Sequence, residues 1–149
     1  RMFEGLIDFI EESIFARITR ILDDIPDATT RCGTILSLLL GFAEKNPGLA
    51  RVLGGDVLTG ETARLRQRVH QLFERLETQL KQVLREAELR EGLRTSISAS
   101  AAANLLIAQA EGRISQYVRS DFKRLPTEYW DDQWTLISGQ LLRATAQPA

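Results

Sequence analysis

The sequence lacks most of the residues from which catalytic and metal sites are built. Its 149 residues include one cysteine and one histidine, which are Cys32 and His70. A single cysteine excludes an internal disulfide, and no Cys/His spacing typical of a zinc site occurs. Gly-rich phosphate loops and the Gly-x-Ser-x-Gly elbow of hydrolases are also absent. The sequence therefore predicts no enzyme, no metal site and no cofactor.

Proline and strand-forming patterns are also scarce. Only four prolines occur, each where a helix would begin or the chain would end, and alternating β-branched residues are absent. Every element is therefore predicted to be helical. With 149 residues, the chain is expected to form one domain with a sizeable core.

Excess charge and long apolar runs are missing as well. The net charge is −1, so the chain by itself is not a basic nucleic-acid binder. Its longest apolar runs are far shorter than the ~20 residues that span a bilayer, and no signal peptide is evident. The lone cysteine fits a reducing compartment, so we expect a cytoplasmic protein. Because the chain opens at Arg1 inside an apolar-periodic segment, we also expect its natural N-terminus to lie upstream.

Apolar residues that recur at intervals of three and four predict six helices. In the second helix, the stretch from Ile35 to Leu40 is apolar nearly all round and is predicted to be central and buried. Asn46 is expected to cap a short helix that Pro47 begins. The predicted helices are residues 1–22, 27–45, 47–53, 61–91, 98–122 and 128–143, with turns or loops at 54–56 and 93–96 and a frayed tail at 144–149.

The fourth predicted helix has the clearest pattern. It would be roughly 45 Å long, and Gly92 is expected to end it. Its other face is rich in Arg, Glu and Gln. Its single apolar face comprises Leu65, Val69, Leu72, Phe73, Leu76, Leu80, Val83, Leu84 and Ala87.

The last two helices have apolar faces that are wider than one packing partner requires. Two such helices from each protomer would form a four-helix bundle across a two-fold axis, so a homodimer is predicted. The alternative is that these faces pack only inside one subunit. The expected interface residues are Ala101, Leu105, Ala108 and Gly112 in the fifth helix and Trp130, Trp134, Ile137 and Leu141 in the sixth.

The titratable residues favour structural roles over chemistry. His70 lies beside the apolar face of its helix, and Cys32 is predicted to be a buried, inert thiol. Asp8, Glu11 and Glu12 are expected to form a solvated acidic face. The arginines of the fourth helix are interleaved with glutamates, which is typical of an exposed salt-bridged face rather than a nucleic-acid surface.

The second helix also presents a surface on which a partner could be held. Leu38, Gly41 and Lys45 are three and four residues apart and share one face. A glycine inside a helix costs ~1 kcal/mol relative to alanine, which is better explained if a neighbouring chain must come close. On the first helix, Phe9 falls off the core stripe and is available as an exposed aromatic anchor, with Arg17 further along. The alternatives are tight packing of Gly41 within the subunit and plain solvation of the two cations.

Six short motifs follow one another along the chain. They are LLLGF at 38–42, NPGL at 46–49, QLFER at 71–75, QVLRE at 82–86, VRS at 118–120 and FKRLPT at 122–127. In this order they resemble one branch of the TetR-type regulators, the nucleoid occlusion factors, and the resemblance covers essentially the whole chain. In TetR-type proteins, a segment like Arg1-Met2-Phe3 follows directly after a three-helix DNA-binding head.

This resemblance implies an all-α, TetR-type C-terminal regulatory and dimerisation domain over residues 1–149, with the N-terminal helix-turn-helix head absent from this chain. It implies a cytoplasmic, nucleoid-associated homodimer that binds palindromic DNA through that head. Such proteins inhibit cell division by capturing the C-terminal tail of the tubulin-like protein FtsZ, which blocks Z-ring assembly over the chromosome.

The resemblance also implies where the tail binds, in a groove between the first and second helices. The matching positions are Phe9, Arg17, Leu38, Gly41, Lys45 and Asn46. Lys45 departs from the arginine typical of the family, which keeps the charge but loses the planar fork. The alternative function is that of a TetR-type transcriptional repressor domain, in which a small apolar ligand enters an internal cavity.

Overall fold

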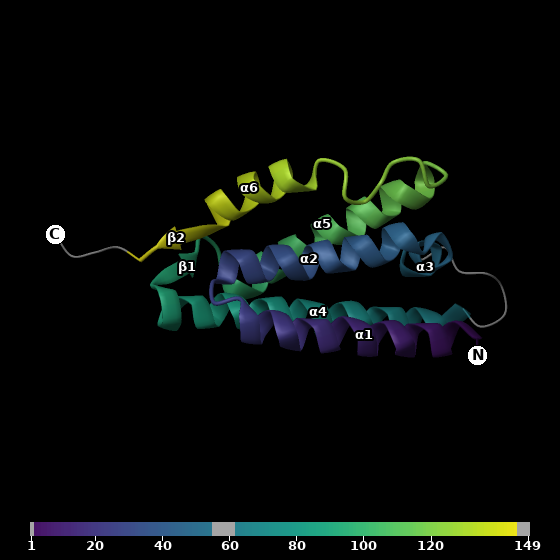
Figure 1. The fold of residues 1–149 in the computed structure, drawn as a ribbon, viewed down its shortest axis with the longest axis horizontal. Coiled ribbons are helices and arrows are strands. Elements are labelled where there is room, and N and C mark those ends of the chain that lie inside the picture. The colour runs from purple at the N-terminus through teal and green to yellow at the C-terminus, as the bar shows by residue number, and fades with distance from the viewer. Residues whose placement is uncertain (1, 55–61, 146–149) are drawn as a thin grey trace.

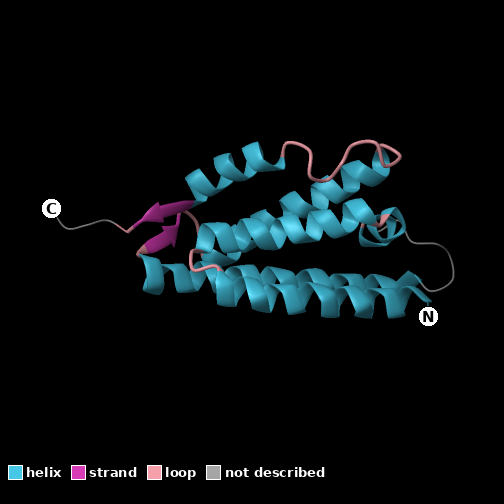
Figure 2. Ribbon diagram, viewed as in Figure 1, coloured by secondary structure: helices cyan, strands magenta, loops and turns pink. Residues whose placement is uncertain are grey.

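The computed structural model describes residues 2–54 and 62–145, with side chains from residue 5 and from residue 63 onward in the two ranges. Several predictions lie outside the described residues: the turn at Gly55 and Asp56, the helix start at Glu61, the tail at 146–149 and the side chain of Phe3. The described ranges form six helices and two short strands (Figure 1, Figure 2).

The six predicted helices are confirmed, each within a few residues of its predicted bounds. The domain is all-α except for two short strands, which lie near the C-terminal end of the chain (Figure 2). The elements are α1 (Met2–Asp24), α2 (Ala28–Lys45), α3 (Pro47–Leu53), α4 (Thr62–Glu91), β1 (Leu93–Thr95), α5 (Ala99–Arg119), α6 (Trp130–Leu141) and β2 (Leu142–Ala144).

Helix α2 is central, as its nearly all-round apolar sequence predicted. It contacts α1, α3, α4, α5 and α6. Helices α1 and α4 run side by side on one side of it, and α6 lies on the opposite side (Figure 1). Within the predicted buried stretch, Ile35, Leu36, Leu39 and Leu40 are at most 1% exposed. Leu38 is half-buried, so one face of α2 remains at the surface.

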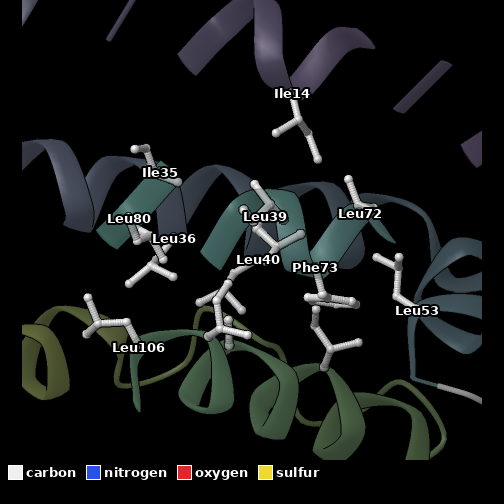
Figure 3. Packing of buried hydrophobic residues seen from close by; sticks show 14 of the residues in the cluster. Ile14, Ile35, Leu36, Leu39, Leu40, Leu53, Leu72, Phe73, Leu80 and Leu106 are labelled. Atoms are coloured by element: carbon white, nitrogen blue, oxygen red, sulfur yellow. The ribbon is translucent and has the colours of Figure 1, made fainter. Parts of the chain in front are cut away.

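The apolar face of α4 supplies much of the core. All nine residues predicted for that face are buried. Figure 3 shows Leu72, Phe73 and Leu80 of α4 among side chains from α2 and α5, including Leu36 and Leu106. A fully buried aliphatic or aromatic side chain of this kind contributes about 1.5–3 kcal/mol. Packing of α2 against α4 and α5 therefore holds the domain together.

Polar contacts fix the corner between α1 and α2. The buried Arg31 donates from Nε to the Ile25 carbonyl (2.6 Å) and from Nη2 to the Leu22 carbonyl (2.7 Å). Carbonyls at a helix C-terminus lack helical partners, so these bonds satisfy groups that burial would otherwise make costly. The Glu91 carboxylate, at the end of α4, accepts the Ala28 backbone N–H at 3.0 and 3.1 Å. The start of α2 is thereby fastened to two other helices.

The prediction that every element is helical is wrong at two short strands. β1 and β2 pair antiparallel, with Arg94 opposite Arg143. They replace the predicted loop at 93–96 and the end of the predicted sixth helix. Strands of three residues are too short to show the alternation by which a strand is recognised in a sequence.

Left-handed backbone makes the two C-terminal helices shorter than predicted. Asp121 and Phe122 have φ values of 58° and 62°, so α5 stops before them. Tyr129 has a φ of 63°, so α6 begins one residue later. Gly92, with a φ of 66°, ends α4 as predicted, because glycine adopts this conformation without steric cost.

Truncation of a core leucine tests the assigned face of α4. Because Leu76 is 0% exposed, we expect Leu76→Ala to lower the free energy of unfolding by about 2–5 kcal/mol. Leu89→Ala is the matched control on the same helix, since Leu89 is 90% exposed and its loss should change that free energy by no more than ~0.5 kcal/mol. Urea unfolding followed by circular dichroism measures both. Equal effects would contradict the assignment.

Candidate functional site

A groove of about 520 Å³ runs between α1 and α2. Two of its lining residues come from α1, and the others come from α2 and the residue that follows it. Five of the six predicted partner-binding residues line this groove; Phe9 does not. The lining residues are Arg17, Ile21, Thr34, Ser37, Leu38, Gly41, Phe42, Lys45 and Asn46.

Helical spacing brings these side chains together. On α2, the lining residues recur at steps of three and four from Thr34 to Lys45, which places them on one face. Arg17 and Ile21 lie one turn apart on α1 and line the same groove. Ile21 and Leu38 are half-buried, whereas Arg17 and Lys45 are exposed. The groove therefore combines an apolar interior with cations on both helices.

Two cations of the groove, Arg17 and Lys45, form no ion pair with a carboxylate in the described ranges. The Arg17 Cζ lies 5.3 Å from the centroid of the Phe42 ring, a cation–π contact of ~0.5–1 kcal/mol at an exposed site. The surface thus offers an anionic partner two positive groups next to apolar side chains.

Gly41 leaves an open gap in the α2 side of the groove. A Cβ at this position would have no heavy atom within 4 Å, so packing within the described subunit does not require the glycine. The alternative of tight packing at Gly41 is therefore excluded for these residues. Gly33 is the opposite case, because a Cβ there would lie 2.9 Å from two ring atoms of Trp134.

Asn46 occupies the N-cap position of α3, as predicted, and its backbone carbonyl accepts the Ala50 N–H at 2.9 Å. It precedes Pro47, but its side chain makes no capping bond at the start of α3. Its Nδ2 instead donates to the Phe42 carbonyl at 2.9 Å, and its backbone N–H donates to the Ala43 carbonyl at 3.2 Å. Both bonds satisfy carbonyls in the last turn of α2. Asn46 thus lines the groove while closing the helix before it.

Phe9 lies beyond the end of the groove lining. Its side chain is 63% exposed, and the helical rise puts it about 12 Å before Arg17 along α1. Leu6, also on α1, is 37% exposed. Phe9 is thus an exposed aromatic residue on the same helix, separate from the groove lining.

Four lining residues were missed in the sequence. Thr34 and Ser37 lie four residues before Leu38 and Gly41, so helical spacing could have predicted that they share the same face. A third lies one turn after Arg17 on α1 and packs partly against the core. The missed residues are Thr34, Ser37, Ile21 and Phe42.

The row of small residues on α5 is exposed in the single subunit. Ala101, Leu105, Ala108 and Gly112 are all exposed, and a Cβ at Gly112 would meet nothing within 4 Å. Leu105 is 39% exposed. This row remains available for contact with a second copy of the chain.

Of the residues predicted for the α6 half of the dimer interface, Trp130 and Leu141 are buried in this subunit, and Trp134 and Ile137 are half-buried against its core. Trp134 lies on Gly33 of α2, where the missing side chain makes room for the indole ring. Trp134 and Ile137 keep part of their surface exposed, and the outward side of α6 carries Leu136 at 70% exposure.

Asp8 and Glu11 of α1 are predicted to be solvated, but in the structure both form ion pairs. Glu11 pairs with Arg75 of α4 at 2.8 Å, and Asp8 pairs with Arg68. The Arg75 Cζ also lies 3.8 Å from the centroid of the Phe15 ring. Exposed ion pairs are each worth ~0–1 kcal/mol, so these contacts orient α1 against α4 more than they stabilise the domain.

No metal-binding cluster occurs in the described ranges, where no group of three or more His, Cys, Asp or Glu could hold an ion. His70 is exposed and lies 3.8 Å from Glu74. Cys32 is buried, as predicted, and burial raises the pKa of its thiol to about 12. Among residues 2–54 and 62–145, no helix is both long and apolar enough to cross a bilayer.

The thiol of Cys32 gives a test by chemical labelling. We expect Ellman's reagent at pH 8 to label the native protein only as fast as it unfolds, and to label it at once in urea, because the thiolate is the reactive form. Rapid labelling of the native protein would contradict the assigned burial.

The same thiol predicts a pH dependence of stability. Burial raises the folded-state pKa from 9.0 to about 12, so the contribution of the thiol to stability is full below pH 9 and is lost as the pH rises toward 12. The free energy of unfolding should therefore fall more steeply above pH 9 than it does in Cys32→Ala. Identical pH profiles would contradict the raised pKa.

Two alanine substitutions separate the glycine of the groove from the glycine of the core. Gly41→Ala should raise the free energy of unfolding by up to ~1 kcal/mol, because alanine favours helix and the added methyl meets open space. Gly33→Ala should lower it by about 1–3 kcal/mol, because the methyl would overlap the Trp134 ring. Urea denaturation measures both, and changes of the same sign would contradict the described geometry.

Comparison with known proteins agrees with this architecture. Residues 26–142 match the SlmA-like family described as "Tetracyclin repressor-like, C-terminal domain". Over 144 residues, which are 97% of this chain and 73% of each relative, the chain is 58% identical to the nucleoid occlusion factor SlmA of Shewanella amazonensis and 56% identical to that of Shewanella frigidimarina.

A solved structure shares the fold. The transcriptional regulator FadR from Bacillus subtilis, in complex with stearoyl-CoA, superposes with a TM-score of 0.69 over 92% of this chain and 75% of that protein. Its sequence identity of 17% supports the fold alone. The sequence relatives carry the finer assignment, and the chain belongs to the SlmA family of nucleoid occlusion factors, the cell-division branch of the TetR-type regulators.

Proposed function

We propose that this chain binds the C-terminal tail of FtsZ in the α1–α2 groove and so blocks Z-ring assembly over the chromosome. The observation that carries the proposal is the groove itself, which gathers five residues implied by the family resemblance from α1, α2 and the position after α2. Membership in the family of nucleoid occlusion factors supports cell division as the process in which the groove would act. Binding of a segment, rather than catalysis, is the proposed activity.

The chemistry of the groove suits a short peptide that is both acidic and partly apolar. Arg17 and Lys45 would attract its carboxylates, and attraction of this kind speeds encounter and sets orientation. Half-buried Leu38 and Phe42 offer apolar contact. The open space above Gly41 would let a peptide backbone come close to the backbone of α2. Phe9, further along α1, would hold an apolar side chain outside the groove.

We further propose that the protein acts as a homodimer on DNA. The exposed row of α5, with Leu136 of α6, would contact the same surface of a second copy across a two-fold axis. A helix-turn-helix head preceding α1 would bind palindromic DNA and place the protein on the nucleoid, in the cytoplasm. DNA-bound dimers would then raise the local concentration of grooves that face the division protein.

The alternative function, sensing of a small apolar ligand, has weaker support. A ligand cavity usually presents a few polar groups that orient the ligand. Within the described residues, every buried side-chain nitrogen or oxygen already has a hydrogen-bond partner. Buried side chains of α2 and α4 belong to one hydrophobic core, part of which Figure 3 shows. The surface groove therefore remains the better candidate.

A carboxylate placed in the groove tests the proposal. Gly41→Asp should weaken binding of a fluorescein-labelled FtsZ tail peptide at least tenfold in fluorescence anisotropy, since like-charge contacts at interfaces cost several kcal/mol and tenfold is only ~1.4 kcal/mol. Because the position opens to empty space, the fold and the dimer should persist by circular dichroism and sedimentation.

Gly139→Asp is the matched control for this substitution. It also adds a carboxylate at a helical glycine with nothing within 4 Å, but on α6, which lies on the side of α2 opposite α1 (Figure 1). Its peptide affinity should stay within about twofold of the unmodified chain, because the added charge does not line the groove. Normal affinity of Gly41→Asp would remove the groove from the proposed function.

A further inference from the structure

Glu44 connects the groove to parts of the chain that do not line it. It precedes Lys45 in the last turn of α2. Its backbone carbonyl accepts a hydrogen bond from the Tyr117 hydroxyl of α5 at 2.9 Å, and its carboxylate accepts one from the Thr127 hydroxyl. Two distant segments thus hold one residue beside the groove.

Both of these anchors are themselves held firmly. The Tyr117 side chain is 3% exposed, and its ring packs edge-on against Phe122 with the centroids 5.2 Å apart. Thr127 lies in the α5–α6 loop, residues 120–129, which a single buried guanidinium fixes from inside. That guanidinium, of Arg113, donates to the carbonyl of Pro126 at 2.6 Å and to the carbonyl of Glu128.

The last turn of α2 needs such support. Helix ends fray because their final carbonyls lack helical partners. Asn46 supplies donors to two of these carbonyls, and Tyr117 supplies the donor to Glu44. With all three bonds in place, Lys45 and Asn46 line the groove from a fixed backbone. The protein then loses less conformational entropy when a peptide binds.

We propose that Glu44 is a positioning residue for the peptide groove, and that Tyr117 and Thr127 set the affinity of the groove by holding it. The inference rests on the proposed function. It makes peptide binding at α1 and α2 depend on α5 and the α5–α6 loop. Because α5 also carries the exposed row proposed for dimerisation, one helix would serve both contacts.

Removal of each hydroxyl tests the proposal. Tyr117→Phe and Thr127→Val keep the shape of the side chain and should each weaken binding of the labelled tail peptide roughly three- to tenfold, the range that corresponds to one hydrogen bond. Tyr129→Phe is the matched control, because Tyr129 is 64% exposed and its hydroxyl makes no hydrogen bond to another described residue. Its affinity should be unchanged.

Substitution of Glu44 separates positioning from charge. Glu44→Gln keeps an oxygen that can accept from Thr127, whereas Glu44→Ala does not, and both remove the same negative charge. If Glu44 acts only through charge, both variants should bind an acidic peptide more tightly and to the same extent. Positioning instead predicts that Glu44→Ala binds at least threefold more weakly than Glu44→Gln, again the range of one hydrogen bond.

Hydrogen exchange gives a readout that a general loss of stability would not produce. In Tyr117→Phe, the amides of Lys45 and Asn46 should exchange faster, while amides in the middle of α2 and α4 keep their protection. Uniformly faster exchange would contradict a local positioning role.

The outcomes distinguish this inference from the function on which it rests. Normal peptide affinity in both Tyr117→Phe and Thr127→Val, together with lost affinity in Gly41→Asp, would overturn the positioning role and leave the groove standing. Normal affinity in Gly41→Asp as well would overturn both.

Discussion

The structure depends on the burial of α2 on nearly all sides. Leu36, Leu39 and Leu40 are fully enclosed by side chains of neighbouring helices, and the apolar face of α4 supplies much of that enclosure (Figure 3). One face of α2 escapes, and that face carries Leu38 and Lys45. The same constraint thus builds the core and leaves a single strip of the central helix to line the groove with α1.

A central helix is useful for binding because its ends can be fixed by distant parts of the chain. At its start, Arg31 and Glu91 tie α2 to α1 and α4. At its end, Tyr117 and Thr127 tie Glu44 to α5 and the following loop. A groove whose backbone is held at both ends loses little conformational freedom when a peptide binds, which is how preorganisation raises affinity.

The three- and four-residue spacing of apolar side chains predicted the helices and their buried faces. The α4 face was predicted in full, because burial on one side of a long helix leaves a repeating pattern. The groove residues of α2 followed from spacing and family resemblance together. The place of the Trp134 ring did not, since it uses the space that Gly33 of α2 leaves open. The two strands likewise pair segments that are distant in sequence, which local patterns do not encode. The side chain of Asn46 bonds locally, to the carbonyl four residues before it, and a short polar side chain at a helix end can make this bond instead of an N-cap bond.

The central claim is that the surface between α1 and α2 holds the tail of the division protein. Titration of the ¹⁵N-labelled chain with unlabelled FtsZ tail peptide, followed by ¹H–¹⁵N correlation spectra, tests it most directly. The account predicts the largest shift changes at residues 17–21 and 34–46, with little change along residues 101–112 of α5. Changes concentrated on α5, or spread through the core with the groove unaffected, would contradict it.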